Sequence, residues 1–273
     1  MKTFRNYLGV LLILVWGLAP FYWMVITALR DKAYTFSTNP LPSHLTLDNF
    51  ADALATDAGN NFLRAIGNSL LVSFATTLIA LAVGVFTAYA LARVDFRGKG
   101  AVTGIILAAS MFPGIALVTP LFQLFRSIEW IGTYQALIIP NISFVLPLTV
   151  YTLTSFFREL PWKLEEAARV DGASRSLAFR KVILPLAAPA LFTTAILAFI
   201  ATWNEFMLAK QLSTTDTEPV TVAIARFSGP SAFEYPYAAT MAAGALVTIP
   251  LVIMVLIFQH RIVAGLTAGG VKA

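Results

Sequence analysis

Six long apolar stretches, separated by polar segments, dominate the pattern of this 273-residue chain. Each is about 20 residues or longer, which is the length that an α-helix needs to cross the hydrocarbon core of a bilayer. A helix also satisfies its own backbone hydrogen bonds, as lipid requires. The predicted spans are 7–29, 65–92, 101–121, 135–157, 186–208 and 238–259.

The composition agrees with a membrane protein, because 58% of the residues are hydrophobic and only 12% are charged. We expect an all-α fold in one transmembrane domain covering 1–273. Lys2 and Arg5 precede the first apolar run, as they would in a signal peptide. That run continues to about Leu29 without a small-residue cleavage site, so we expect a retained helix.

The distribution of Lys and Arg predicts the orientation. With the N-terminus in the cytoplasm, 13 of the 19 basic residues fall in the inner segments and 6 in the outer ones. Both termini are therefore predicted to be cytoplasmic. The net charge of +5 is then a topology signal and does not indicate a nucleic-acid partner.

Prolines interrupt several of the apolar runs and are expected to bend the helices. The segment from Met111 to Phe122 holds Pro113, Gly114 and Pro120, so it is the strongest candidate for a discontinuous span. Bent helices either surround a cavity or only fix packing angles, and the sequence favours neither reading. In the first outer loop, LTLDNFADALA predicts a short helix that begins near Asp48, with the Asp48 side chain as its N-cap.

Polar side chains at membrane depth are candidate contacts for a transported molecule. Asparagine amides bond hydroxyl groups, and an indole face stacks on a sugar ring. Glu205 is the only acid within the predicted spans, and its position near the outer end also fits a group that reaches interfacial water. The candidate pathway residues are Asn141, Ser143, Trp203, Asn204 and Glu205.

Catalytic and metal-binding patterns are absent from the sequence. There is no cysteine, and His44 and His260 are predicted on opposite sides of the membrane, so no metal site is expected. Gly98-Lys99 lacks the upstream glycine and the following Ser or Thr of a phosphate-binding loop. We therefore expect a protein that is not an enzyme and does not hydrolyse ATP by itself.

The inner loop 158–185 is the most polar part of the chain and predicts two short helices. Pro161 is suited to open the first helix, and Gly172 is suited to the left-handed residue that ends it. Ser174 can cap the second helix, which is expected to run through Ile183 and stop at Pro185.

The first of these helices has two possible roles. Leu164, Ala167, Ala168 and Asp171 share one face, and the two alanines permit close approach by another surface. On the other face, Glu165 and Arg169 are spaced for an i,i+4 ion pair. The pattern alone favours a solvated helix at the lipid headgroups and also allows a docking helix.

The motif Glu166-Ala167-Ala168, followed by Asp171-Gly172-Ala173 and Ile183-x-Pro185, resembles the EAA motif of permease subunits of binding-protein-dependent ABC importers. The resemblance extends over PSHLTLDNF, MFPGIALVTPLF, ATWNEFMLA and FQHRIVAGLTAGGVKA. These features are similar to the second permease of carbohydrate importers of the maltose and trehalose type. His260 departs from the pattern, since many relatives carry a second basic residue there.

The resemblance implies a type I importer permease in the bacterial inner membrane that moves a di- or oligosaccharide by alternating access. It implies a second homologous permease, two ATPase subunits that bind ATP and Mg, and an extracytoplasmic solute-binding protein. The implied ATPase-coupling residues are Glu165, Glu166, Ala167, Ala168, Asp171, Gly172 and Ala173. The C-terminal residues implied to contact the ATPases are Gly265, Leu266 and Thr267.

Two other classes of protein remain as alternatives. An ion-coupled secondary transporter would use Glu205 as its titrating group, although the chain has no clear repeated halves. A membrane-embedded enzyme would need clustered acids or histidines at one interface, which the sequence lacks. The sequence does not identify the sugar.

Overall fold

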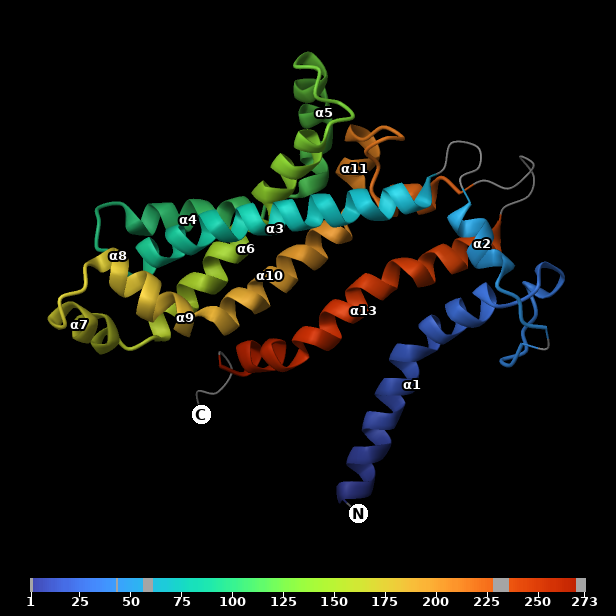
Figure 1. Ribbon diagram of the computed structural model, residues 1–273, viewed down its shortest axis with the longest axis horizontal. Coiled ribbons are helices and arrows are strands. Elements are labelled where there is room, and N and C mark those ends of the chain that lie inside the picture. The colour runs from blue at the N-terminus through green and yellow to red at the C-terminus, as the bar shows by residue number, and fades with distance from the viewer. Residues whose placement is uncertain (1, 43, 56–60, 228–235, 269–273) are drawn as a thin grey trace. The chain divides into compact units, whose positions relative to one another are not determined.

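Helices make up the secondary structure of the residues that the computed structural model describes, which are 2–42, 44–55, 61–227 and 236–268 (Figure 1). Side chains are described only for residues 6–259 of these ranges. The elements are α1 (Lys2–Ala28), the 3₁₀ helix η1 (Lys32–Tyr34), α2 (Asp48–Leu54), α3 (Phe62–Arg93), α4 (Lys99–Ser110), the 3₁₀ helix η2 (Gly114–Leu117), α5 (Val118–Ser127), α6 (Tyr134–Glu159), α7 (Trp162–Val170), α8 (Arg175–Ala178), the π-helix η3 (Phe179–Ile183), α9 (Leu184–Leu186), α10 (Ala188–Trp203), α11 (Met207–Leu212), α12 (Val220–Ala225) and α13 (Tyr237–Ala268).

Four of the described helices, α1, α3, α6 and α13, are long and apolar enough to cross a membrane. Two bent pairs also pass this test: α4 followed by η2 and α5, with a bend of 87°, and α8 to α9 followed by α10, with a bend of 70°. If each pair is one span, the described residues contain up to six spans. The predicted all-α, six-helix membrane fold is confirmed.

The third predicted span is broken, as the segment from Met111 to Phe122 indicated. Helix α4 ends at Ser110, and Pro113 takes an extended conformation with φ −67° and ψ 114°. The chain turns there because proline has no N–H to continue the helical ladder. The prediction of one continuous helix over 101–121 was wrong in this respect.

The fifth predicted span, 186–208, was too long. Helix α10 ends at Trp203, and after a short turn α11 begins at Met207. Glu205 lies in that turn, where its carboxylate accepts hydrogen bonds from the N–H groups of Leu208 and Ala209. Because α11 starts a new helix, residues 204–208 do not continue α10 as the outer end of the fifth span.

The second inner helix does not stop at Pro185, contrary to the prediction. The chain remains helical from Arg175 to Leu186 by way of the π-helix η3, and it bends only before α10. The wider π turn explains this continuation, because it relieves the clash between a proline ring and the preceding turn.

The described residues form two compact units. The first consists of Met1–Gly67 and Val220–Val252, and the second of Asn68–Pro219 and Ile253–Ala273. In the first unit, α1 exposes its apolar side chains on every face, as expected of a helix covered by lipid or by a neighbouring membrane chain. The single-domain assignment of 1–273 stays a prediction.

The loop after α1 folds around a buried arginine. The Arg30 guanidinium donates to the backbone carbonyls of Ser37 and Asn39 and lies 4.9 Å from the ring centroid of Trp23. The predicted short helix is present as α2, but its cap is different. The N–H of Asp48 donates to Thr46 Oγ1 over 3.1 Å, and Asp48 is itself the first helical residue.

Asn49 on α2 closes the loop that follows α1, and we expect Asn49→Leu to destabilise this loop. The buried Asn49 amide donates to the carbonyls of Ala28 and Arg30 over 2.9 and 2.6 Å. Leucine would leave both carbonyls without these donors, at a cost of about 1–3 kcal/mol. In detergent, Asn49→Leu should unfold at a lower Tm than Asn39→Leu, which is the control substitution at an exposed position. Equal Tm values would contradict the role of Asn49.

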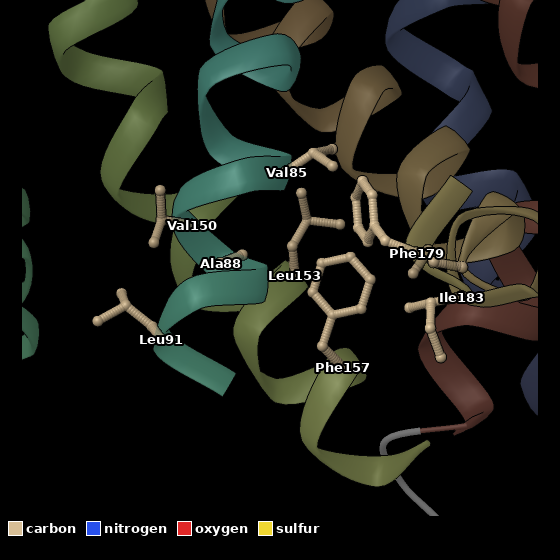
Figure 2. Packing of buried hydrophobic residues seen from close by; sticks show 10 residues of the cluster. Val85, Ala88, Leu91, Val150, Leu153, Phe157, Phe179 and Ile183 are labelled. Carbon is tan, nitrogen blue, oxygen red and sulfur yellow. The ribbon is translucent and has the colours of Figure 1, made fainter. Parts of the chain in front are cut away.

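The second unit has an apolar core where α3, α6 and the inner loop meet (Figure 2). Figure 2 shows Leu153 and Phe157 of α6 in the middle of the cluster, near Phe179 and Ile183 of η3. Buried residues of α3 complete it: Val85, Ala88 and Leu91. The inner loop is therefore packed onto α3 and α6 through a close-packed interior.

Candidate functional site

The first candidate site is the inner loop that contains α7. Pro161 is the N-cap residue and Trp162 is the first helical residue, so the helix begins one position after the predicted opening at Pro161. Glu165 and Arg169 place an acid in the first turn and a base in the last, which suits the helix dipole. A nine-residue helix is short for independent stability, so its ends and its packing must hold it.

The end of α7 has the hydrogen bonds of a Schellman motif. Gly172 has φ +90°, its N–H donates to the carbonyl of Arg169, and the N–H of Ala173 donates to the carbonyl of Ala168. Ser174 then caps α8, because its Oγ accepts from the N–H of Leu177 over 3.2 Å. The predicted glycine turn and serine cap are confirmed.

The outward surface of α7 and the following turn is partly apolar. Val170 is 87% exposed, and Glu166, Ala167, Asp171 and Gly172 are also exposed. Ala168 and Ala173 are half-buried. Trp162, Leu164 and Leu177 are also exposed apolar side chains of this loop, and exposed apolar groups gathered in one region mark a surface that another protein covers.

Val170 is the residue that the sequence analysis missed. The signal was an apolar side chain placed directly before the Asp171-Gly172 turn, outside the face that was assigned by periodicity. We call the exposed residues Glu166, Ala167, Val170, Asp171 and Gly172 the coupling surface.

Glu165 does not belong to this surface. It is only 6% exposed, and its Oε1 accepts a hydrogen bond of 2.8 Å from the Tyr89 hydroxyl on α3. The spacing to Arg169 had suggested an ion pair along the helix. The Glu165 carboxylate instead points inward to α3, because the Tyr89 hydroxyl donates a hydrogen bond to it there.

The second candidate site is a cavity of about 280 Å³ within the second unit. Its walls come from η2, the start of α5, α6, α10 and α11, so the break at Pro113 and the turn between α10 and α11 both border it. Gly114 lets η2 approach α6 closely, because a Cβ at this position would lie 3.2 Å from the Phe144 ring. Most of the lining is apolar, and the polar residues in it are Asn141, Thr149, Thr194 and Glu205.

The structure brings together two of the five predicted pathway residues. Asn141 and Glu205 line the cavity and also a neighbouring space of about 10 Å³, which is the size of one water molecule. Trp203 is instead 1% exposed and stacks on Phe199, so its indole face is not available to a sugar. Ser143 and Asn204 are exposed, and neither lines the cavity.

Two other predictions concern the tail and metals. Gly265, Leu266 and Thr267 lie in the last turns of α13, where the structure describes no side chains, so their ATPase contact stays a prediction. Among the described residues, no group of three or more His, Asp and Glu side chains could hold a metal ion. His44 stacks on Tyr34, with ring centroids 4.8 Å apart.

Relatives of this chain are permease proteins of sugar transport systems. Residues 80–267 match the family described as binding-protein-dependent transport system inner membrane component. The chain is 46% identical to the trehalose transport system permease protein SugB of Mycobacterium tuberculosis, over 96% of this chain and 94% of that protein. It is 42% identical to the trehalose/maltose transport system permease protein MalG of Thermococcus litoralis, over 100% of this chain and 98% of that protein.

A solved structure has the same fold. It is a chain of a bacterial ABC transporter involved in the import of the acidic polysaccharide alginate, with a TM-score of 0.80, 22% identity and coverage of 95% of both chains. The family match includes α6, the α7 turn and both helix breaks of α4–α5 and α8–α10. With its multiple apolar helices and its exposed inner loop, the chain belongs to the inner membrane components of binding-protein-dependent ABC transport systems, as a permease subunit and not an enzyme.

Proposed function

We propose that this permease imports a di- or oligosaccharide, with trehalose or a maltose-like sugar as the substrate. The sugar is delivered by an extracytoplasmic solute-binding protein. A second, homologous permease forms the other half of the membrane pathway. Two ATPase subunits bind ATP and Mg and supply the energy. The choice of sugar rests on the names of the relatives at 46% and 42% identity.

The observation that carries this proposal is the coupling surface on the inner loop. A capped helix that exposes Val170 between Glu166 and Asp171 suits a groove in a soluble subunit better than it suits lipid headgroups. The apolar valine is removed from water on docking, and the acids remain available for basic partner groups. In this reading the coupling surface is the ATPase contact.

The cavity is suited to a pathway segment because two interruptions of the helices border it. The breaks at Pro113 and at residues 204–206 give α5 and α11 backbone positions that can shift without unfolding a continuous span. When the ATPases close, α7 moves as a rigid unit, and the helices around the cavity change their packing. Asn141 and Glu205 then contribute polar contacts along an otherwise apolar wall.

Reconstitution of the four-subunit complex in liposomes with the binding protein tests this function. We expect radiolabelled trehalose or maltose to accumulate inside the liposomes only when the ATPases have ATP and Mg, with glucose as the comparison sugar. Uptake that is driven by an ion gradient without ATP would establish the secondary transporter instead. A labelled lipid-linked product would establish a membrane enzyme.

A further inference from the structure

Two buried charged side chains and a half-buried tyrosine lie between α3 and α7. Tyr89 and Arg93 are one turn apart on α3, and Glu165 is in the first turn of α7. Arg93 and Glu165 are each 6% exposed. Burial of two opposite charges at the base of the inner loop is costly unless other contacts compensate for the lost hydration.

The contacts attach the beginning of α7 to the inner end of α3. The Tyr89 hydroxyl donates to Glu165 Oε1 over 2.8 Å, and Arg93 Nη2 donates to the Leu160 carbonyl over 2.6 Å. The Arg93 guanidinium also lies 4.5 Å from the ring centroid of Trp162. Two residues of α3 therefore hold the residue before the N-cap, the first residue and the first turn of α7.

Tyr89 also joins this polar group to the apolar core. Its ring packs edge-on against Phe157 at 6.0 Å between centroids, and against Phe179 at 4.6 Å. Figure 2 shows Phe157 and Phe179 beside each other in that core. The segments that enter and leave the inner loop, α6 and η3, are thus both in contact with the tyrosine that binds Glu165.

The polar contacts of Tyr89, Arg93 and Glu165 are not the arrangement that stability alone favours. Within the described contacts, Glu165 Oε2 and Arg93 Nε and Nη1 are buried without a hydrogen-bond partner. An apolar group of the same shape would avoid these unpaired atoms, and replacing a buried charge set in this way is often neutral or stabilising. Buried charged groups that carry this cost are suited to hold α7 in one geometry.

We propose that Tyr89, Arg93 and Glu165 are positioning residues that transmit the movement of α7 to α3, and so to the transport pathway. They act through α7 and do not touch the ATPases or the sugar. This inference rests on the proposed function, because α7 must be the coupling helix for its movement to matter.

The test uses the complete complex in liposomes and measures sugar imported per ATP hydrolysed, normalised to assembled complex. Tyr89→Phe and Glu165→Leu each remove the bond of 2.8 Å. We expect each to lower this ratio by about tenfold, the effect of losing a hydrogen bond to a charged group. Because both variants remove the same bond, the double variant should be close to the single variants. Glu165→Gln keeps an acceptor and should restore much of the ratio.

Matched controls come from exposed residues of α6, namely Tyr151→Phe and Glu159→Leu, which should leave the ratio unchanged. An unchanged ratio in Tyr89→Phe and Glu165→Leu would overturn the inference. Lower amounts of assembled complex with an unchanged ratio would also overturn it, because the cluster would then be only structural. Absence of ATP-driven import by the unmodified complex would instead overturn the proposed function.

Discussion

Replacing Gly172 with valine is expected to lower ATP-coupled sugar uptake sharply while the chain still inserts and folds. Gly172 has φ +90°, and a β-branched residue in that left-handed conformation is strained by about 1–2 kcal/mol. The strain would open the Schellman turn and displace Val170 and Asp171 on the coupling surface. The open space around Gly172 means that the new side chain meets no atom of this chain, so its bulk would project toward the docked subunit. We expect uptake by the reconstituted complex to fall by at least about tenfold, together with binding-protein-stimulated ATP hydrolysis.

A matched control for backbone strain is Gly98→Val. Gly98 also has φ +90° and open space, but it is the N-cap residue of α4, outside the coupling surface. We expect uptake in Gly98→Val to stay within about threefold of the unmodified complex. We expect uptake in Gly172→Asn to lie between the values for the two valine variants, because asparagine tolerates the left-handed conformation. Full uptake in Gly172→Val would exclude this turn from the ATPase contact.

Local rules predicted the turn of the inner loop because the chemistry there depends on single residues. Gly172 supplies the positive φ, and Ser174 supplies the cap, so neighbours far along the chain do not change either assignment. The Pro185 stop was wrong because a proline ends a helix only if the preceding turn keeps its α geometry. The π-helix of Phe179–Ile183 widens that turn, and its packing on α3 and α6 is not visible in local sequence.

The direction of side chains on α7 was harder to predict. Periodicity placed Glu165 on the same face as Arg169 and did not show which face points inward, because a short helix of mixed polarity gives no clear inward stripe. The inward position of Glu165 depends on a donor, Tyr89, that lies 76 residues earlier. Val170 was missed for the complementary reason, since an apolar residue is normally assigned to an interior.

The residues of the membrane pathway were predicted from residue type, and only two of the five line the cavity. Asn141 and Glu205 line the cavity, but Trp203 packs inside the second unit against Phe199. One residue along a helix rotates a side chain by about 100°, so neighbours such as Trp203 and Asn204 face different surroundings. The breaks that shape the cavity were visible as Pro113-Gly114 at one end and were hidden at the other. There, the helix start depends on a carboxylate that accepts backbone hydrogen bonds.

Glu205 separates an ATP-driven importer from an ion-coupled transporter. Its two carboxylate oxygens accept from Leu208 N–H over 2.8 Å and from Ala209 N–H over 2.9 Å, which fixes the start of α11 beside the cavity. Glu205→Gln retains one acceptor oxygen, so we expect ATP-driven uptake to stay within about threefold. Glu205→Ala removes both acceptors from the amides of the buried residues Leu208 and Ala209, and losing hydrogen bonds to a charged group costs about 1.5–3 kcal/mol. Uptake in Glu205→Ala should therefore fall by about tenfold or more.

The two variants distinguish a structural carboxylate from a titrating one. A structural carboxylate predicts that glutamine preserves transport and alanine does not, because the hydrogen bonds matter and the proton does not. A titrating carboxylate predicts that both variants lose transport equally, since neither can bind and release a proton. Glu129→Ala, which removes an exposed acid from the loop after α5, controls for loss of negative charge and should leave uptake unchanged. Equal loss in Glu205→Gln and Glu205→Ala, together with uptake that follows an imposed proton gradient, would reject the structural role and favour ion coupling.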